Sequence, residues 1–94
     1  MSVDDVLQKI IEICRELSAE KVYLYGSRAK GTNVERSDID IAAAGVKEFE
    51  HLEEAVEEID TLYTIDLLNL DTVRNQNLLE DVVLYGRKIY EKIS

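Results

Sequence analysis

The sequence contains no proline and no tryptophan, and only one cysteine and one histidine among 94 residues. A single cysteine excludes a disulfide within the chain, and one cysteine with one histidine does not support a zinc site. No apolar run approaches the roughly 20 residues needed to cross a bilayer, and the N-terminus lacks the basic start of a signal peptide. We therefore expect a cytoplasmic protein with no role at a membrane.

Positive charge is also scarce, since 11 basic residues stand against 20 acidic ones and the net charge is −9. Phosphate contacts dominate nucleic-acid affinity, so we expect no direct binding to nucleic acid. The acid is densest in residues 47–60, which hold seven acids and one base. Such a run is typical of a solvated helix face, on which His51 would be exposed. The alternative is a docking surface for a basic partner.

Helical and strand patterns alternate along the chain. Apolar residues recur at helical spacing from Val3 to Leu17, behind a capping box of Ser2 and Asp5, and Cys14 falls among them as a small core residue. Strands are expected at 21–25, 38–44 and 63–70, and further helices at 48–59 and from 73 or 75 to 85. Residues 87–91 could form a final strand or continue the last helix.

This alternation predicts one α+β domain over residues 1–94, in which helices flank a small mixed sheet. The connection from Gly26 to Ser37 is too short for a regular doubly wound fold. The sheet is therefore expected to depart from regular β-α-β alternation at this point.

Gly26 and Ser27 follow directly after the first predicted strand. Glycine allows a backbone to approach a ligand closely, and a helical turn starting near Ser27 would point free amide groups at an anion. The serine hydroxyl would add a further donor. Taken alone, a Gly-Ser pair is more often simply a turn.

Asp38 and Asp40 open the second predicted strand. Side chains two positions apart on a strand share a face and lie roughly 6–7 Å apart. Two such carboxylates repel each other, but a divalent cation makes the pair favourable. Oxygen ligands suit magnesium or manganese, and two metal ions can hold the attacking and leaving oxygens of an in-line displacement. The alternative is an exposed edge strand.

Asp66 interrupts an otherwise apolar strand between Ile65 and Leu67. An acid in a buried strand is costly unless it is paired or bound to metal, so Asp66 is the third candidate ligand. The alternative is that its face of the strand meets water. Asp60 and Asp71 flank the strand and are expected to be ordinary turn acids.

The combined pattern is Gly-Ser, ten residues, Asp-x-Asp and a later acid, and it resembles the polymerase-beta-like nucleotidyltransferase superfamily. The longer match, Gly-Ser-x-Ala-x-Gly followed by Ser-Asp-Ile-Asp-Ile, is similar to its small prokaryotic branch, the minimal nucleotidyltransferases. The resemblance covers essentially the whole chain. The residues that carry it are Gly26, Ser27, Ala29, Gly31, Ser37, Asp38 and Asp40.

The resemblance implies a nucleotidyltransferase-like fold and a magnesium-dependent transfer of AMP from ATP to a hydroxyl group. It implies that Gly26 and Ser27 hold the triphosphate. It also implies that Asp38, Asp40 and Asp66 are the catalytic residues and bind two magnesium ions. Asp66 would bind one of these ions and help to deprotonate the attacking hydroxyl.

Three basic residues lie close to these positions in the sequence: Arg28, Lys30 and Arg36. All three could contact phosphates, although the family pattern does not fix that role. We place Arg28 and Arg36 with Gly26 and Ser27 among the residues expected to bind the nucleotide.

The resemblance also implies a partner. Minimal nucleotidyltransferases are commonly paired with a helical ribonuclease toxin of the HEPN type, which they counteract by adding AMP to a tyrosine or by holding it. The chain would then be the antitoxin of a toxin–antitoxin pair, acting on a protein acceptor. The toxin, or a second copy in a homodimer, would supply the acceptor surface that larger superfamily members carry in an extra helical domain.

Two other functions stay open. The chain could be a catalytically silent module that neutralises a helical partner by docking, which its small size and net charge of −9 allow. It could also be a homodimeric enzyme that modifies a small molecule such as an antibiotic.

Overall fold

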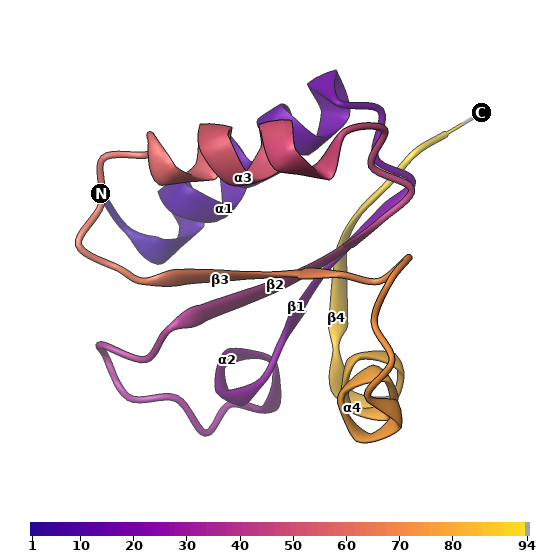
Figure 1. Ribbon diagram of the computed structural model, residues 1–94. Helices are drawn as coiled ribbons and strands as arrows, with labels where there is room; N and C mark the ends of the chain where they lie inside the picture. The colour runs from indigo at the N-terminus through magenta and orange to yellow at the C-terminus, as the bar shows by residue number, and fades with distance from the viewer. Residues whose placement is uncertain (94) are drawn as a thin grey trace.

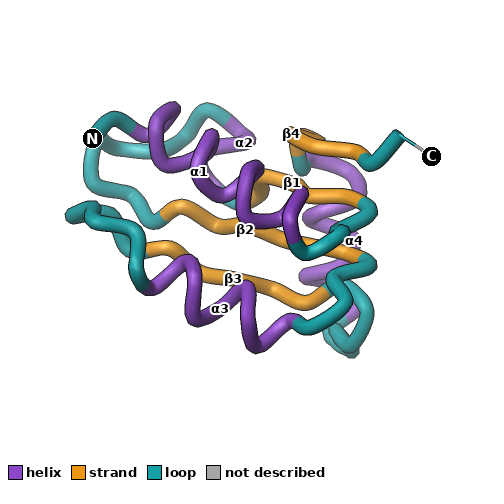
Figure 2. The backbone as a smooth tube through the Cα atoms, turned by 90° about the horizontal axis from the view of Figure 1, so that it is seen from above, coloured by secondary structure: helices purple, strands orange, loops and turns teal. Residues whose placement is uncertain are grey.

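The computed structural model describes residues 1–93. Its strands form one mixed sheet, and its helices flank that sheet (Figures 1 and 2). The helices are α1 (Val3–Glu16), α2 (Ser27–Lys30), α3 (Phe49–Glu57) and α4 (Gln76–Tyr85). The strands are β1 (Lys21–Tyr25), β2 (Ile39–Ala44), β3 (Ile65–Asn69) and β4 (Arg87–Glu91). The strand order is β3-β2-β1-β4, with β2 and β3 parallel and the other pairs antiparallel. The predicted α+β architecture is confirmed.

The local signals in the sequence account for most of these boundaries. The hydroxyl of Ser2 accepts a hydrogen bond from the Asp5 amide, and the Asp5 carboxylate accepts one from the Ser2 amide, so the predicted capping box starts α1. The Asn75 side chain caps α4 by accepting from the Leu78 amide. Residues 87–91 form a strand, because they pair with β1 along its otherwise open edge.

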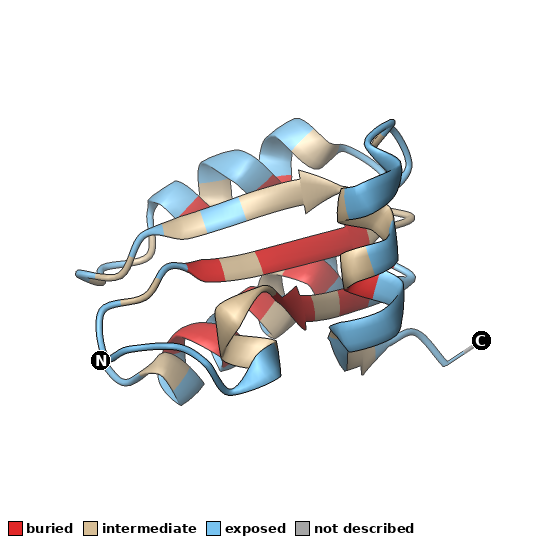
Figure 3. Cartoon of the chain, turned by 90° about the horizontal axis from the view of Figure 1, so that it is seen from below, coloured by how far each residue is buried: buried red, intermediate tan, exposed pale blue. Residues whose placement is uncertain are grey.

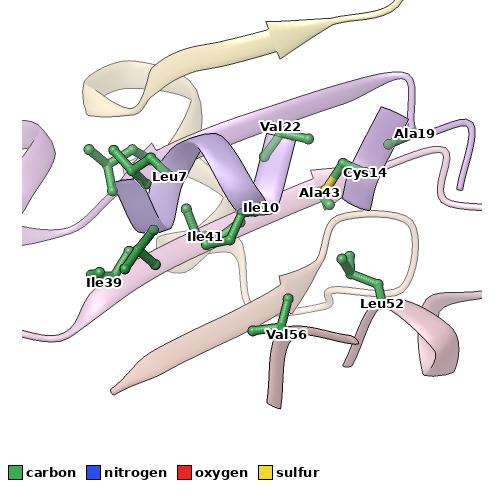
Figure 4. Packing of buried hydrophobic residues seen from close by; sticks show 12 residues of the cluster. Leu7, Ile10, Cys14, Ala19, Val22, Ile39, Ile41, Ala43, Leu52 and Val56 are labelled. Carbon is green, nitrogen blue, oxygen red and sulfur yellow. The ribbon is translucent and has the colours of Figure 1, made fainter. Parts of the chain in front are cut away.

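One face of the sheet is covered by α1 and α3, which lie side by side above it (Figure 1). The inward side chains of these helices pack against those of β1 and β2 in one apolar core (Figure 4). Ile65 and Leu67 of β3 are partly buried against it. Cys14 is fully buried there, and burial raises the pKa of its thiol to about 11, so the thiol stays protonated. Its predicted role as a core residue is confirmed. The buried members are Val6, Leu7, Ile10, Cys14, Ala19, Val22, Leu24, Ile39, Ile41, Ala43, Leu52 and Val56.

The opposite face is covered less completely. Helix α4 crosses it and packs Val82 against Tyr25 and Ala42, while α2 lies near the end of β1 (Figures 1 and 3). Strand β3 stays partly open on this side, and Asp66 is exposed. The alternation of side chains along each strand therefore gives the sheet one apolar face and one face that carries polar groups.

The acidic run lies on the outer side of α3, whose Leu52 and Val56 point into the core. His51 is exposed, as expected, and its Nδ1 lies 2.6 Å from a carboxylate oxygen of Glu48. Asp71 is a turn acid, since its carboxylate accepts a hydrogen bond from the Gly45 amide at 2.9 Å. Among residues 1–93, no helix is both long and apolar enough to cross a membrane.

The burial of side chains on the apolar face leads to a prediction about stability. Ile41 is fully buried on β2, and its replacement in Ile41→Ala leaves a cavity, so we expect a loss of about 2–5 kcal/mol in the free energy of unfolding. Denaturant-induced unfolding measures this loss. The same chemical change at Ile93, which is 96% exposed, should cost less than about 0.5 kcal/mol. Equal losses in the two variants would contradict the assigned core.

Candidate functional site

The turn after β1 is shaped by Gly26. Its φ angle is +73°, a conformation that residues with a side chain rarely adopt. A Cβ atom at this position would also collide with Oδ2 of Asp40. The turn therefore lies directly against a carboxylate of the neighbouring strand, and its positive φ angle favours glycine.

A helical turn starts at Ser27, as the sequence predicted. The Lys30 amide donates to the Gly26 carbonyl at 3.2 Å, and Gly31, with φ at +76°, ends the turn. The first amide groups of a helix lack partners within it, so the backbone at Ser27 offers donors beside Asp40. Phosphate oxygens could accept from these donors.

Three strands bring polar side chains into one row. Tyr25 on β1 stands opposite Asp40 on β2, which in turn stands opposite Asp66 on β3. All three belong to the face that α4 partly covers, because Ile39 and Ile41 occupy the other face of β2. We call these three residues, Tyr25 and the two carboxylates of Asp40 and Asp66, the carboxylate row.

The electrostatics of this row are unfavourable to negative charge. The pKa of Asp40 is raised to about 6, first by burial and then by the negative charges of Asp66 and Asp38, while a hydrogen bond with Asp66 favours the protonated form. The pKa of Tyr25 is raised to about 12, again first by burial and then by the nearby acids. The row therefore favours protons or another source of positive charge.

Asp38 lies just before β2 and is exposed, but it is near enough to Asp40 to raise the pKa of that carboxyl group. Within residues 1–93, no three acidic, histidine or cysteine side chains are already gathered as a metal site. The structure thus places Asp40 and Asp66 opposite each other on β2 and β3, with Asp38 one residue before β2. Carboxylate oxygens are the donors that magnesium prefers.

A fourth acid near the row was not predicted from the sequence. Asp81 on α4 contributes to the raised pKa of both Asp40 and Tyr25. Helical spacing could have found it, because Asp81 lies three residues after Leu78 and beside Val82, both of which face the sheet.

Lys30 is already paired in this arrangement. Its Nζ lies 2.6 Å from Oδ1 of Asp81 and 5.1 Å from the centroid of the Tyr85 ring. The pair joins α2 to α4 across the face that carries the carboxylate row. Both side chains keep some solvent exposure, so water screens the pair and phosphate could compete for the lysine.

Arg28 does not point to open solvent. Its guanidinium donates to the carbonyl oxygens of Ser37 and Glu35 and lies over the Tyr63 ring. Arg36, the other basic residue expected to bind nucleotide, is exposed and lines a hollow of about 620 Å³. None of the three site aspartates lines that hollow, whose walls are Met1, Glu35, Arg36, Asp60, Thr61, Leu62 and Tyr63.

Comparison with known proteins identifies the family to which the chain is similar. The family described as "Polymerase beta, Nucleotidyltransferase" matches residues 8–94, whereas a search of curated proteins gave no significant match. A solved toxin–antitoxin structure with AMP-PNP has 27% identity over 90% of this chain and 73% of that chain, at a TM-score of 0.68.

Two further solved structures are similar. A mutant of the toxin–antitoxin MntA-HpeT, with two aspartates two positions apart changed to glutamate, has 25% identity over the same shares, at a TM-score of 0.67. A putative nucleotidyltransferase from Sulfolobus solfataricus has 22% identity over 96% of this chain and 86% of that chain, at a TM-score of 0.55. The last shows the shared fold only.

The family match spans the Gly26 turn, the strands of the carboxylate row and α4. The mixed sheet with flanking helices agrees with the family match and aligns with the toxin–antitoxin structures over 90% of this chain, so the nucleotidyltransferase-like fold that the sequence implied is confirmed. The chain belongs to the polymerase-beta nucleotidyltransferase family, and within it to the minimal nucleotidyltransferases.

Proposed function

We propose that the protein transfers AMP from ATP to a hydroxyl group of a protein acceptor, with magnesium, as the antitoxin of a cytoplasmic toxin–antitoxin pair. The observation that carries this proposal is the close approach of the Gly26 turn to Asp40, whose Oδ2 a Cβ atom on Gly26 would meet. It sets backbone donors for a triphosphate directly beside the carboxylates that would hold its metal ions. A HEPN-type helical toxin is the proposed partner and acceptor.

The similar structures support both the use of ATP and the protein partner in this proposal. One relative was crystallised with AMP-PNP, which is an ATP analogue. In the MntA-HpeT mutant, the two substituted aspartates have the same spacing as Asp38 and Asp40 here. Both relatives are toxin–antitoxin proteins, which favours a protein partner over a small-molecule substrate.

The residues divide the chemistry between them. Gly26 and Ser27 would hold the triphosphate, and Asp38, Asp40 and Asp66 would hold magnesium. Magnesium, when bound, would offset the negative charge that develops on the phosphates. The acceptor oxygen attacks the α-phosphorus, the bond from that phosphorus to the bridging oxygen breaks, and pyrophosphate leaves. Asp66 is exposed and would take the hydroxyl proton.

Without a cation, ionised Asp40 opposes folding. An acid whose pKa is higher in the folded state than in the unfolded state binds protons more tightly when folded. Its contribution to stability is therefore present below its ordinary pKa of 3.8 and is lost as the pH rises to about 6. At neutral pH the metal-free protein carries this cost, and magnesium at the carboxylates would relieve it.

We predict that Asp40→Asn stabilises the metal-free protein at pH 7.5 relative to wild type, but not at pH 4. After allowance for solvent screening the difference should be about 1 kcal/mol, or roughly 4–8 °C in melting temperature. Thermal unfolding with EDTA over pH 4–8 measures it. Magnesium should raise the melting temperature of wild type at pH 7.5 and have a smaller effect on the variant.

Asp60→Asn is the matched control, because Asp60 is exposed and is not among the acids that raise the pKa of Asp40 or Tyr25. Its melting temperature should follow wild type at every pH, with and without magnesium. A metal-free Asp40→Asn variant that is no more stable than wild type at pH 7.5 would contradict the charge repulsion.

We predict that joint replacement of Asp38 and Asp40 by asparagine lowers AMP transfer at least about a hundredfold, because the metal ligands are lost. The assay uses ATP labelled at the α-phosphate, with a HEPN-type helical toxin as acceptor. Calorimetry with AMP-PNP should show binding that requires magnesium in wild type and is lost in the double variant.

Asp60→Asn again controls for the loss of one negative charge and should transfer AMP like wild type. Undiminished labelling by the double variant would rule out the proposed mechanism. Absence of magnesium-dependent AMP-PNP binding in wild type would count against any enzymatic function.

One observation favours a second function, neutralisation by docking alone. The C-terminal end of α4 exposes three large apolar residues, with Val83 70%, Leu84 69% and Tyr85 59% exposed. Such a patch suits contact with another protein. In this case toxin neutralisation would survive the Asp38 and Asp40 substitutions and would be lost in Leu84→Asp, whereas the enzymatic proposal requires the carboxylates.

A further inference from the structure

Arg28 contacts two separate loops. Its Nε and Nη2 donate to the Ser37 carbonyl oxygen at 3.2 and 2.7 Å, and Nη2 also donates to the Glu35 carbonyl oxygen at 3.1 Å. The guanidinium carbon lies 5.2 Å from the centroid of the Tyr63 ring, within range of a cation–π interaction. A single side chain on α2 thus joins the loop before β2 to the loop before β3.

Each of these loops leads directly into a carboxylate of the site. The Ser37 carbonyl group belongs to the peptide bond that precedes Asp38. Tyr63 lies two residues before β3 and three residues before Asp66. Arg28 itself follows Ser27 in α2, so it is rigidly connected to the phosphate turn.

The loop from Thr32 to Ser37 needs such a brace. Its own hydrogen bonds are short-range: the Val34 amide donates to Ser37 Oγ at 2.9 Å, and the Ser37 amide donates to the Val34 carbonyl at 3.0 Å. Residues 32–36 are exposed. A guanidinium makes hydrogen bonds in a rigid planar fork, which lysine cannot reproduce.

We propose that Arg28 is a positioning residue, which fixes Asp38 and the start of β3 relative to the Gly26–Ser27 turn and does not bind the triphosphate. This role differs from the nucleotide contact expected from the sequence. The proposal rests on the proposed function for its consequence in metal binding, but the bracing of the loop can be tested without metal or nucleotide.

The test compares Arg28→Lys and Arg28→Gln with wild type by amide hydrogen exchange of residues 32–38. Arg28→Lys keeps the charge and loses the fork, so both variants should exchange faster, by about tenfold or more. The matched controls are Arg15→Lys and Arg15→Gln. Arg15 lies over the Tyr90 ring at 5.8 Å on α1, far along the chain from this loop, and its variants should leave the exchange of residues 32–38 unchanged.

The second readout separates positioning from phosphate binding. The magnesium concentration for half-maximal thermal stabilisation should rise about tenfold in both Arg28 variants, since a displaced supporting residue typically weakens metal binding by this factor or more. Binding of AMP-PNP at saturating magnesium should match wild type. The proposal predicts the same outcome for lysine and glutamine, whereas a phosphate contact would be largely preserved by lysine.

Two results would overturn the proposal. One is wild-type exchange of residues 32–38 in both Arg28 variants. The other is an AMP-PNP affinity at saturating magnesium that falls in Arg28→Gln and is retained in Arg28→Lys. If wild type itself binds neither magnesium nor AMP-PNP, the proposed function fails, while the exchange data still decide whether Arg28 braces the loop.

Discussion

The mutual repulsion of Asp40 and Asp66 on adjacent strands is the interaction on which the site depends. Their positions follow from the register of β2 and β3, and that register is held from the other face by buried Ile39 and Ile41. A slip of one residue would turn Asp40 into the apolar core and a large side chain out of it. The core therefore keeps the carboxylates together against a force that would separate them.

Two basic residues close to the row in sequence, Lys30 and Arg28, make their contacts elsewhere. Lys30 pairs with Asp81, and the guanidinium of Arg28 is turned toward backbone carbonyls, so neither lies in the row itself. A partly exposed ion pair contributes little to stability. The repulsion around Asp40 is thus not offset by either of these two basic residues, so burial and the nearby acids together keep its pKa raised.

The sequence could predict those features that depend on local spacing. The alternation of strand side chains predicted Asp38 and Asp40 on one face, although Asp38 lies just before β2, and Gly26 was expected at the sharp turn after β1. The pairing of Asp40 with Asp66 depends on register between strands 26 residues apart in sequence, which no local pattern encodes. Asp81 enters through the crossing of α4, and the direction of Arg28 follows from the path of an irregular loop. Residues 87–91 were ambiguous because the free edge of β1, and not their own pattern, made them a strand.

The two faces of the sheet let the site vary without loss of the fold. Asparagine has nearly the shape of aspartate, and Asp38 and Asp66 are exposed, so their replacement leaves no cavity in the core. Replacement of Ile41 does leave one, although it lies next to Asp40 in sequence. The neighbouring residues Asp40 and Ile41 on β2 are therefore constrained differently, the first by electrostatics and the second by packing. In a chain with a core this small, the packing on one face sets how much uncompensated charge the other face can hold before a ligand binds.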